Sequence, residues 1–444
     1  MGASSSYPAV SATHTAPSNI ALIKYWGKRD AAVNTPLNSS ISLTLSQDDL
    51  RATTTVVAHS SFERDRLWLN GEEVELSGNK RVRAVLREMR ARACDRVVPS
   101  GSEAGAPPVR IPKDALRAWK VHIVSRNNFP TAAGLASSAA GYAALVHTLA
   151  EVYDVREAFP GELSTVARQG SGSACRSLAG GLVEWRMGAM VSGSDSMGVQ
   201  FAPAEHWPEL ALLIAVVSGE KKATGSTSGM LRAVATSELL RHRAQVCVPR
   251  RLEALKAAFA ARDFPALARL TMEDSNQFHA TCLDTFPPVF YMNDVSKAIV
   301  ALVHAINDAA SAAAGSPTAI AAYTFDAGPN AVLLTTREHA PHVLAVLLAH
   351  FPAPAAAGEA QAPYVSGEGL GPALVERAAA LVPGLAGALA APAGGRGAGL
   401  VKHIYATTVG DGPRKLGAAE ALADPATGLP LSTSRVEGMD KGLE

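Results

Sequence analysis

One stretch of the N-terminal half constrains the fold most, because a strand pattern, a loop of small residues and an Ala-rich helix pattern follow one another. Residues Lys120 to Ser125 alternate polar and apolar side chains, which predicts a strand. The Ala- and Leu-rich segment from Ser137 to Val152 contains no proline and predicts a helix. Unpaired backbone N–H groups and the helix dipole converge where such a loop meets a helix. The stretch therefore predicts an anion site, with Gly134 at the centre of the loop.

This loop also has an ordinary explanation. Ser137 or Ser138 could simply cap a helix after a surface loop, and the pattern alone does not separate the two interpretations. The chain contains no Gly-Lys-Ser or Gly-Lys-Thr, which excludes a Walker A loop. No Gly-x-Gly-x-x-Gly follows the strand, which excludes a dinucleotide fingerprint. The two serine hydroxyls could bind a phosphate or a phosphate-bound metal.

Length and composition describe a folded chain without a strong overall charge. With 444 residues the chain is long for a single hydrophobic core, so two domains are expected. Its 48% hydrophobic and 18% charged residues exclude a disordered protein. Lys and Arg number 41 against 40 Asp and Glu, so no bulk charge attracts nucleic acid or a membrane. An anionic substrate would therefore need a local cationic cluster.

The chain has four widely spaced cysteines, Cys94, Cys175, Cys247 and Cys282. Because no two form a Cys-x-x-Cys pair, they argue against a zinc site or a disulfide framework and predict a reducing, cytoplasmic location. Cys175 has no histidine nearby in the sequence, so we expect a small buried residue. No secretory signal is predicted at the N-terminus. The most apolar late segment, from Ala378 to Ala393, is too short and too interrupted to span a bilayer.

Two polar segments of the N-terminal half are candidates for a site. A cationic and aromatic group, Lys24-Tyr25-Trp26-Gly27-Lys28-Arg29, directly follows an apolar strand pattern from Ile20 to Ile23. A solvated sheet edge is the commoner explanation for such cations, but Trp26 beside a glycine favours a packed pocket wall. In the segment from Arg168 to Ser177, glycines alternate with hydroxyls, and Arg176 offers the planar guanidinium that pairs with a carboxylate or phosphate. A flexible surface loop is the alternative there.

The C-terminal half contains two similar candidates. A continuous apolar run from Leu210 to Val217 predicts a buried strand, and Lys221 and Lys222 follow it in a Gly/Ser/Thr-rich loop. Simple solvent exposure and a phosphate-facing role both explain these lysines. Asp326 lies at the turn of a strand–turn–strand pattern, where Asp followed by Gly-Pro-Asn is also an ordinary turn signature. His279 has no second ligand at metal spacing, so a structural role is expected.

Together these segments resemble one enzyme family. Pro130-x-x-x-Gly134-Leu135-x-Ser137-Ser138-Ala139 looks like the central motif of the GHMP small-molecule kinase superfamily. Ala136 and the preceding Asn127-Asn128-Phe129 are similar to its mevalonate diphosphate decarboxylase branch. Three further segments resemble the same branch. They are Pro17-x-Asn19-Ile20-Ala21…Lys24-Tyr25-Trp26-Gly27-Lys28, Gly170-Ser-Gly-Ser-Ala-Cys-Arg176 and Thr324-Phe-Asp-Ala-Gly-Pro-Asn-Ala331. These dispersed segments match in family order, and the resemblance covers most of the chain from Thr15 to Gly410.

The resemblance implies an activity, a fold and partners. Members of this family use ATP to phosphorylate the 3-hydroxyl of mevalonate 5-diphosphate, and loss of phosphate and CO2 then gives isopentenyl diphosphate. The implied fold is a GHMP-kinase-like, two-lobed α+β (two-layer α/β) fold, with the active site in the cleft between an N-terminal ATP-binding lobe and a C-terminal ferredoxin-like lobe. The expected co-substrate and ion are ATP and Mg2+. A homodimer is expected, with no nucleic-acid or membrane partner. The expected divisions are a disordered extension at 1–14, lobes at 15–205 and 206–412, and a mobile tail at 413–444.

The resemblance also implies roles for individual residues. The catalytic residues implied are Asp326, Arg176, Lys24 and Asn19; the substrate-binding residues are Tyr25, Lys28, Ser171, Ser173, Arg176 and Ser226; the ATP-binding residues are Pro130, Ala133, Gly134, Leu135, Ala136, Ser137, Ser138 and Lys222. Asp326, the one acid inside a matched motif, would orient or deprotonate the 3-hydroxyl. Arg176 would clamp the substrate carboxylate, with Asn19 orienting it, and Lys28 would bind the diphosphate. Mg2+ would be held mainly by the ATP phosphates, with Ser138 as its protein ligand.

Three other functions stay open at this point. The chain could act on mevalonate 5-phosphate, or it could phosphorylate the 3-hydroxyl without elimination. It could also be an inactive nucleotide-binding or scaffold relative. The complete motif set, including Lys28 and Asp326, favours the diphosphate decarboxylase, and the presence of Asp326 and Arg176 argues against an inactive relative.

Overall fold

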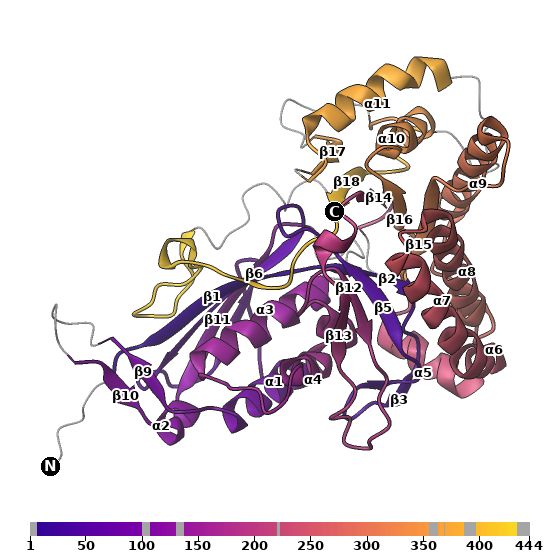
Figure 1. The fold of residues 1–444 in the computed structure, drawn as a ribbon. Helices are drawn as coiled ribbons and strands as arrows, with labels where there is room; N and C mark the ends of the chain where they lie inside the picture. Colours follow the sequence, from indigo (N-terminus) through magenta and orange to yellow (C-terminus); the bar gives the residue numbers. More distant parts are fainter. Residues whose placement is uncertain are drawn as a thin grey trace, which may run out of the picture.

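The computed structural model has two lobes that meet along a common junction (Figure 1). The N-terminal lobe contains the indigo and magenta elements, and the C-terminal lobe contains most of the reddish and orange ones. This arrangement confirms the predicted two-lobed α+β architecture. The structure describes residues 7–99, 107–129, 137–219, 223–354, 363–367, 369–385 and 397–432.

Within the described residues, two sheets and four helices form the N-terminal lobe. The larger sheet has the strand order β19-β1-β6-β11-β7-β8, and the smaller one has the order β13-β12-β5-β2. The strands are β1 (Val10–Pro17), β2 (Asn19–Ile23), β5 (Ser40–Thr44), β6 (Arg51–His59), β7 (Arg66–Leu69), β8 (Glu72–Val74), β11 (Lys120–Asn127), β12 (Leu182–Trp185), β13 (Gly198–Ala202) and β19 (Arg414–Lys415). The helices are α1 (Lys80–Ala91), α2 (Lys113–Ala118), α3 (Ser137–Val152) and α4 (Glu162–Gly170). Short pairs and turns complete the lobe: β3 (Lys28–Asp30) with β4 (Thr35–Pro36), β9 (Arg96–Val98) with β10 (Val109–Ile111), and the 3-10 turns η1 (Gly172–Arg176), η2 (Ala204–His206) and η4 (Ala418–Glu420).

Helix α3 lies close against the larger sheet because small side chains cover both surfaces. Ala140, Ala143 and Ala144 of α3 pack with Ala16 of β1 and Ala52 of β6, and all five are fully buried. Such dense packing fixes the helix relative to the sheet. The contact therefore sets the position of the α3 N-terminus, which follows the predicted phosphate loop. Strand β11 and helix α3 confirm the predicted strand and helix on either side of that loop.

Within the described residues, a five-stranded sheet covered by helices forms the C-terminal lobe, in the order β15-β16-β14-β18-β17. The strands are β14 (Leu210–Val216), β15 (Ala321–Phe325), β16 (Ala331–Thr336), β17 (Val365–Ser366) and β18 (His403–Thr408). The helices are α5 (Ser226–Thr236), α6 (Glu238–His242), the π-helix η3 (Arg243–Cys247), α7 (Val248–Ala260), α8 (Phe264–Leu283), α9 (Asp294–Ala314), α10 (Ala340–His350) and α11 (Pro372–Leu385). Every residue of β14 is buried, which confirms the predicted buried strand.

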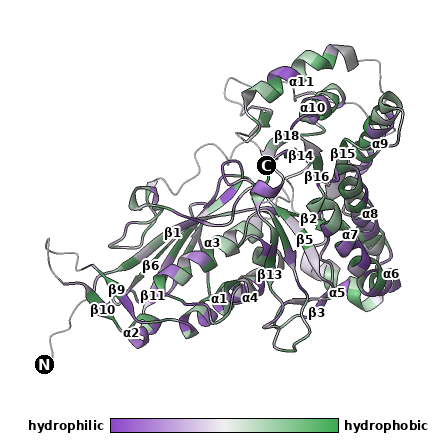
Figure 2. Ribbon diagram, viewed as in Figure 1, coloured by the Kyte–Doolittle hydropathy of each residue, from purple (hydrophilic) through white to green (hydrophobic). Residues whose placement is uncertain are grey.

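A shared hydrophobic core holds the two lobes in one arrangement. Figure 2 shows hydrophobic residues concentrated on the central strands, including β2 and β5. One apolar cluster runs from Ile41 and Leu43 of β5 through Leu212 of β14 to Val343 of α10. Among the helices in the described ranges, none is both long and apolar enough to cross a membrane.

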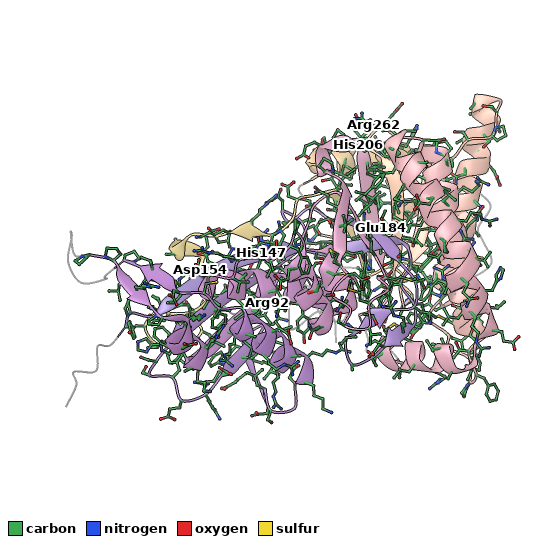
Figure 3. The ribbon with its side chains drawn as sticks, turned by 60° about the horizontal axis from the view of Figure 1, so that its bottom comes forward. Arg92, His147, Asp154, Glu184, His206 and Arg262 are labelled. Carbon is green, nitrogen blue, oxygen red and sulfur yellow. The ribbon has the colours of Figure 1, made fainter. Side chains whose placement is uncertain are left out.

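The junction between the lobes also contains polar contacts. Gly410, just after β18, donates its N–H to the Thr44 carbonyl at 2.9 Å. A Cβ atom at Gly410 would lie 2.5 Å from the Ser46 Cα, so only glycine allows this close approach. Glu184 of β12, labelled at the junction in Figure 3, lies 3.5 Å (Oε2) from Lys256 Nζ of α7. These contacts fix the walls of any cavity between the lobes.

Two sequence-based expectations about the chain ends are wrong for the residues that the structure describes there, 10–14 and 413–432. The sequence predicts a loose extension at 1–14, but β1 (Val10–Pro17) forms a full ladder with β6. The sequence also predicts a mobile tail at 413–444, but as far as residue 432 the tail lies on the N-terminal lobe and contributes β19 to its sheet. Leu422 is buried there, and its N–H donates to Thr55 Oγ1 at 2.9 Å. Among residues 413–432 only Leu422, Ala423 and Gly428 are buried, so no hydrophobic period marks this segment in the sequence.

Candidate active site

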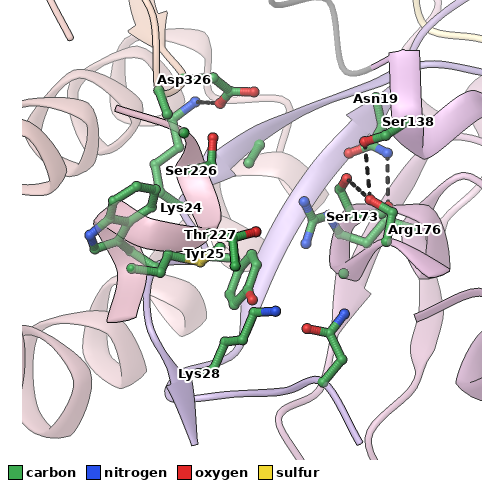
Figure 4. Close-up of a pocket in the computed structure, with 18 of the residues that line it drawn as sticks. Asn19, Lys24, Tyr25, Lys28, Ser138, Ser173, Arg176, Ser226, Thr227 and Asp326 are labelled. Atoms are coloured by element: carbon green, nitrogen blue, oxygen red, sulfur yellow. Dashed lines mark hydrogen bonds and ion pairs between the residues drawn. The ribbon is translucent and has the colours of Figure 1, made fainter. Parts of the chain in front are cut away.

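A cavity of about 770 Å³ lies between the two lobes. The N-terminal lobe contributes β2 and the segment after it, η1 and the first residues of α3, and the C-terminal lobe contributes α5 and the turn after β15. Figure 4 shows Lys24 and Asp326 on one side of this cavity and Arg176 on the other. The predicted site residues that line it are Asn19, Lys24, Tyr25, Lys28, Ser137, Ser138, Ser171, Ser173, Arg176, Ser226 and Asp326. The other predicted residues, Pro130, Ala133, Gly134, Leu135, Ala136 and Lys222, lie outside the described residues.

Lys24 and Asp326 form an ion pair across the lobes. Lys24 Nζ lies 2.7 Å from Asp326 Oδ1. The Lys24 side chain is 3% exposed, whereas that of Asp326 is 36% exposed. Burial lowers the pKa of Lys24, and the neighbouring Asp326 carboxylate opposes this effect. Asp326 thus borders the cavity with a cation fixed beside it. The sequence predicted both residues for the site but not their pairing.

Arg176 is a buried cation on the opposite side of the cavity. Its side chain is 3% exposed, and Nη1 donates to Ser40 Oγ at 2.7 Å. The guanidinium carbon lies 5.6 Å from the ring centre of Trp185. Among the described residues, the buried Nε atom has no hydrogen-bond partner, and no carboxylate forms an ion pair with this guanidinium. Burial lowers the pKa of Arg176. A buried cation beside a cavity favours the binding of an anion there.

Asn19 supports the turn that contains Arg176. Its Nδ2 atom donates to the Ser173 carbonyl at 3.1 Å and to Ser177 Oγ at 2.8 Å. The Oδ1 atom is buried without a hydrogen-bond partner among the described residues. Asn19, predicted to orient Arg176, therefore contacts the Ser173 carbonyl and the Ser177 hydroxyl at η1 and not the guanidinium itself.

A row of hydroxyls joins the N-terminus of α3 to η1. Ser138 Oγ lies 3.2 Å from Ser171 Oγ, which lies 3.3 Å from Ser173 Oγ. Ser137 and Ser138 open the 16-residue helix α3. The first backbone N–H groups of a helix have no partner within it, and the dipole favours negative charge there. Phosphate oxygens therefore fit this corner of the cavity.

Lys28 and Arg81 form a second cationic group, of which the sequence identified only the lysine. Both line the cavity, and Arg81 Nη2 of α1 donates to Thr227 Oγ1 of α5 at 2.9 Å. Burial lowers the pKa of Lys28, and the charge of Arg81 lowers it further. Two adjacent cations attract a multiply charged anion. The sequence missed Arg81 because the basic pattern of this helix does not distinguish it from Arg83 or Arg87.

Tyr25 and Ser226 add hydroxyls from the two lobes. The Tyr25 ring packs 4.6 Å from the Trp185 ring, and its hydroxyl is buried without a hydrogen-bond partner among the described residues. Burial raises the pKa of Tyr25 well above its ordinary value, so the phenol stays protonated and can donate to an anion. Ser226 opens α5 and also lines the cavity.

A smaller cavity of about 220 Å³ adjoins the first and shares Ser137 and Ser138 with it. Its other lining residues are Thr54, Leu67, Leu69, Asn70, Asn79, Val82, Ile123, Ser125, Asn127, Gly141, Tyr142 and Leu145. Apolar walls with a few polar groups suit a flat heterocyclic ring. No sequence pattern pointed to this cavity, because its walls come from β6, β7, β11, α1 and α3.

The acidic, histidine and cysteine side chains of the described residues bear on two kinds of chemistry, that of a protein-held metal ion and that of a reactive thiol. In the described parts of the chain, no group of three or more His, Cys, Asp or Glu side chains could hold a metal ion. Burial raises the pKa of Cys175 to about 12, which disfavours a nucleophilic thiolate. His279 packs against the rings of Phe278 and Phe325, and burial lowers its pKa to about 4. These surroundings fit the predicted structural role of His279.

Two family models together match most of the chain. Residues 16–198 match the diphosphomevalonate decarboxylase-like N-terminal domain. Residues 212–416 match the mevalonate 5-diphosphate decarboxylase C-terminal domain.

Individual relatives are similar over nearly their full length. The diphosphomevalonate decarboxylase of Rattus norvegicus is 50% identical over 404 residues, 91% of this chain and 93% of the relative. That of Homo sapiens is 50% identical over 412 residues, with 92% and 94% covered. A crystal structure of mevalonate 5-diphosphate decarboxylase is 43% identical, covers 95% of this chain and 100% of its own, and has a TM-score of 0.76. The structure of MDDEF in complex with MVAPP, AMPPCP and magnesium is 27% identical, covers 92% of this chain and 100% of its own, and has a TM-score of 0.67.

Proposed function

The chain belongs to the diphosphomevalonate decarboxylase family, and on this premise we propose how its cavity carries out the reaction. Its activity is that of a diphosphomevalonate decarboxylase. ATP phosphorylates the tertiary 3-hydroxyl of mevalonate 5-diphosphate, and loss of phosphate and CO2 leaves isopentenyl diphosphate and ADP. A tertiary alcohol is a poor leaving group, and phosphorylation corrects this. As the C3–O bond breaks, the carboxylate releases CO2 and its electrons form the new double bond.

The observation that best supports this assignment is the arrangement of charges in one cavity. The Lys24–Asp326 pair faces Arg176, while Lys28 and Arg81 provide a separate cationic group. A substrate with a reacting hydroxyl, a carboxylate and a diphosphate needs these three environments.

Asp326 is the residue that we assign to the 3-hydroxyl. Its partly exposed carboxylate accepts a hydrogen bond from this hydroxyl, aligns it for attack on the γ-phosphate and takes its proton. Once this proton has passed to water through the exposed part of the carboxylate, the restored negative charge stabilises the positive charge that develops at C3. Lys24 holds the carboxylate in place, because its Nζ atom lies 2.7 Å from Asp326 Oδ1.

Arg176 is the residue that we assign to the substrate carboxylate. Its unpartnered Nε atom and buried guanidinium offer a planar donor pair to a carboxylate. Binding there holds the carboxylate in fixed geometry beside C3 until the C–C bond breaks. Asn19 maintains the turn that supports this contact through its bonds to Ser173 and Ser177.

The diphosphate of the substrate is assigned to the cationic group of Lys28 and Arg81. Tyr25, Ser171, Ser173, Ser226 and Thr227 supply the surrounding hydroxyls. Two cations match a diphosphate better than a monophosphate, which favours mevalonate 5-diphosphate over mevalonate 5-phosphate.

ATP is assigned to the corner formed by the α3 N-terminus and to the smaller cavity beyond it. Ser137 and Ser138 border both cavities, so adenine in the smaller one would place the phosphates at the helix N-terminus. The predicted contacts from Pro130, Ala133, Gly134, Leu135, Ala136 and Lys222 remain part of this proposal. The Ser138 hydroxyl fits an Mg2+ ion that keeps most of its contacts to phosphate and water. When bound, the ion neutralises charge on the phosphates.

One assay tests the reaction as a whole. The purified protein is mixed with ATP, Mg2+ and either mevalonate 5-diphosphate or mevalonate 5-phosphate, and ADP and CO2 are measured together. We expect equal amounts of ADP and CO2 with the diphosphate and much less of both with the monophosphate. ADP without CO2 would indicate a kinase, neither product would indicate a binding protein, and equal use of the monophosphate would refute the substrate assignment.

Assembly, location and domain division complete the proposal. A homodimer is supported by exposed apolar side chains at the end of α8, where Leu283, Phe286 and Phe290 are 53%, 77% and 74% exposed. Equilibrium sedimentation of the full chain and of Phe286→Ser tests the homodimer, since the variant should be more monomeric.

The four cysteines form no disulfides, which supports a cytoplasmic location. We place the domain boundary between residues 205 and 206, before β14.

A further inference from the structure

A fully buried ion pair lies between the π-helix η3 and helix α8, next to Lys24. Arg243 Nη1 and Nη2 donate to Asp274 Oδ1 and Oδ2 at 2.8 and 2.7 Å, and both side chains are 0% exposed. Arg251 adds a contact from Nη1 to Asp274 Oδ1 at 3.0 Å. Removing such charges from water offsets most of their mutual attraction. Stability alone is therefore a weak explanation for this pair.

The pair contacts both main-chain polar groups of Lys24. The Lys24 N–H donates to Asp274 Oδ2 at 2.8 Å. The Lys24 carbonyl accepts from Arg243 Nη2 at 3.2 Å and from Asn38 Nδ2 at 3.1 Å. Because all of these contacts are buried and two of them involve charged groups, they fix the backbone of Lys24 firmly.

Helix α8 also contacts the strand that ends just before Asp326. The Phe325 N–H donates to Ser275 Oγ at 3.0 Å, and Ser275 directly follows Asp274. Figure 1 shows α8 running beside β15. One turn of α8 therefore sets the main chain at Lys24 and beside Asp326. The neighbouring η3 is a π-helix, a rare form that often occurs at functional sites.

We infer that Arg243 and Asp274 are positioning residues, which hold Lys24, and through it Asp326, in the geometry that phosphoryl transfer and elimination require. This inference rests on the proposed roles of Lys24 and Asp326. A displacement of about 1 Å in a reacting group can cost about 100-fold in rate. Loosening the backbone of Lys24 therefore lowers kcat. The substrate contacts on the opposite side of the cavity stay intact, so KM changes little.

Two matched arginine variants test the inference. Arg243 and Arg251 both contact Asp274 and Gln277, but only Arg243 also contacts Lys24. A lysine at either position keeps the positive charge but lacks the planar guanidinium group, which can donate hydrogen bonds to two acceptors at once. With full-length protein, ATP and mevalonate 5-diphosphate, we expect Arg243→Lys to lower kcat about 10-fold or more while KM changes by less than about 2-fold. Arg251→Lys should keep its kcat, even where its Tm falls as far as that of Arg243→Lys.

A second variant covers the case in which Arg243→Lys does not fold. Asn38→Ser removes the other hydrogen bond to the Lys24 carbonyl without leaving a buried charge unpaired, and it should also lower kcat with little change in KM. The inference is overturned if Arg251→Lys loses as much kcat as Arg243→Lys, or if folded Arg243→Lys and Asn38→Ser both keep full turnover. If Asp326→Asn loses turnover while Arg243→Lys and Asn38→Ser keep it, only the positioning role is refuted. Full turnover in Asp326→Asn would refute the proposed site itself.

Discussion

The two walls of the main cavity differ in whether their buried charges already have partners. On what we call the paired wall, Lys24 and Asp326 lie 2.7 Å apart. On the open wall, formed by Asn19, Ser138, Ser173 and Arg176, no described carboxylate pairs with the arginine, and the Arg176 Nε and Asn19 Oδ1 atoms have no described hydrogen-bond partner.

This difference separates the two tasks of the site. The paired wall is assembled before the substrate arrives, so it can act on the reacting atoms without further reorganisation. On the open wall, Arg176 forms no ion pair with a described carboxylate, so this wall gains a favourable interaction when an anion binds. Changes in the paired wall should therefore lower mainly kcat, and changes in the open wall should raise mainly KM. The predictions below test this division, in order of decreasing effect.

The largest effect is expected from Asp326→Asn on the paired wall. An amide cannot accept the hydroxyl proton or stabilise positive charge at C3, so kcat should fall about 1000-fold. Steady-state kinetics and calorimetric titration with ATP measure the change, and the Kd for ATP should hardly move. Asp308→Asn, an exposed position on α9, is the control and should keep full activity. Near-normal turnover in Asp326→Asn would show that the paired wall does not act on the reacting atoms.

On the open wall, Arg176→Gln should lower kcat/KM about 100-fold, because a buried charge-assisted contact to the substrate carboxylate is lost. Most of this change should appear in KM. Arg168→Gln is the control, since Arg168 is also buried but donates to the main-chain carbonyls of Val33 and Gly193. It should lower Tm and leave KM nearly unchanged. An unaltered KM in Arg176→Gln would show that the carboxylate binds elsewhere.

A smaller effect is expected from the cationic group beside the two walls. Arg81→Ala should raise KM for the diphosphate substrate about 10-fold, since one hydrogen bond to a charged group is lost. The discrimination against mevalonate 5-phosphate should fall in parallel, as measured by the ratio of kcat/KM values. Arg83→Ala on the same helix, where the guanidinium binds the Ser77 carbonyl, should change neither value. If both variants behave alike, Arg81 does not contact the diphosphate.

The smallest effect concerns the stability of the protein in acid. Burial lowers the pKa of both His279, beside the paired wall, and His403, on β18, to about 4. The unfolded chain binds protons at these residues below about pH 6.5 while the folded chain does not, so the free energy of unfolding falls between about pH 6.5 and 4.

Urea denaturation at pH 7 and pH 5 measures this loss of stability. His279→Gln and His403→Gln should each reduce it by about 1 kcal/mol. Only the His279 variant borders the site, so His403→Gln should keep its kcat. An unchanged pH dependence in both variants would mean that these histidines are protonated in the folded state.

Local patterns in the sequence predicted much of the fold, and the resemblance to a known family implied most of the proposed site. The strand and helix that flank Gly134 occur as β11 and α3, and the predicted site residues in the described ranges all line the main cavity. Such positions are predictable because a loop after a strand, or a turn between strands, lies at the end of an element where ligands bind. Arg81 and Thr227 were not predictable in this way, because their helices have no pattern that marks a cavity.

The sequence by itself determined which chemical groups are present and which segments form strands and helices, because both depend on neighbours close in the chain. Only the tertiary structure decided that Lys24 pairs with Asp326, which lies 302 positions away, while Arg176 forms no ion pair with a described carboxylate. The same holds for the contact of Asp274 with Lys24 and for the return of the C-terminal segment to the first sheet. Such contacts depend on how the two lobes pack, and hydrophobic periodicity specifies which face is buried but not what it is buried against.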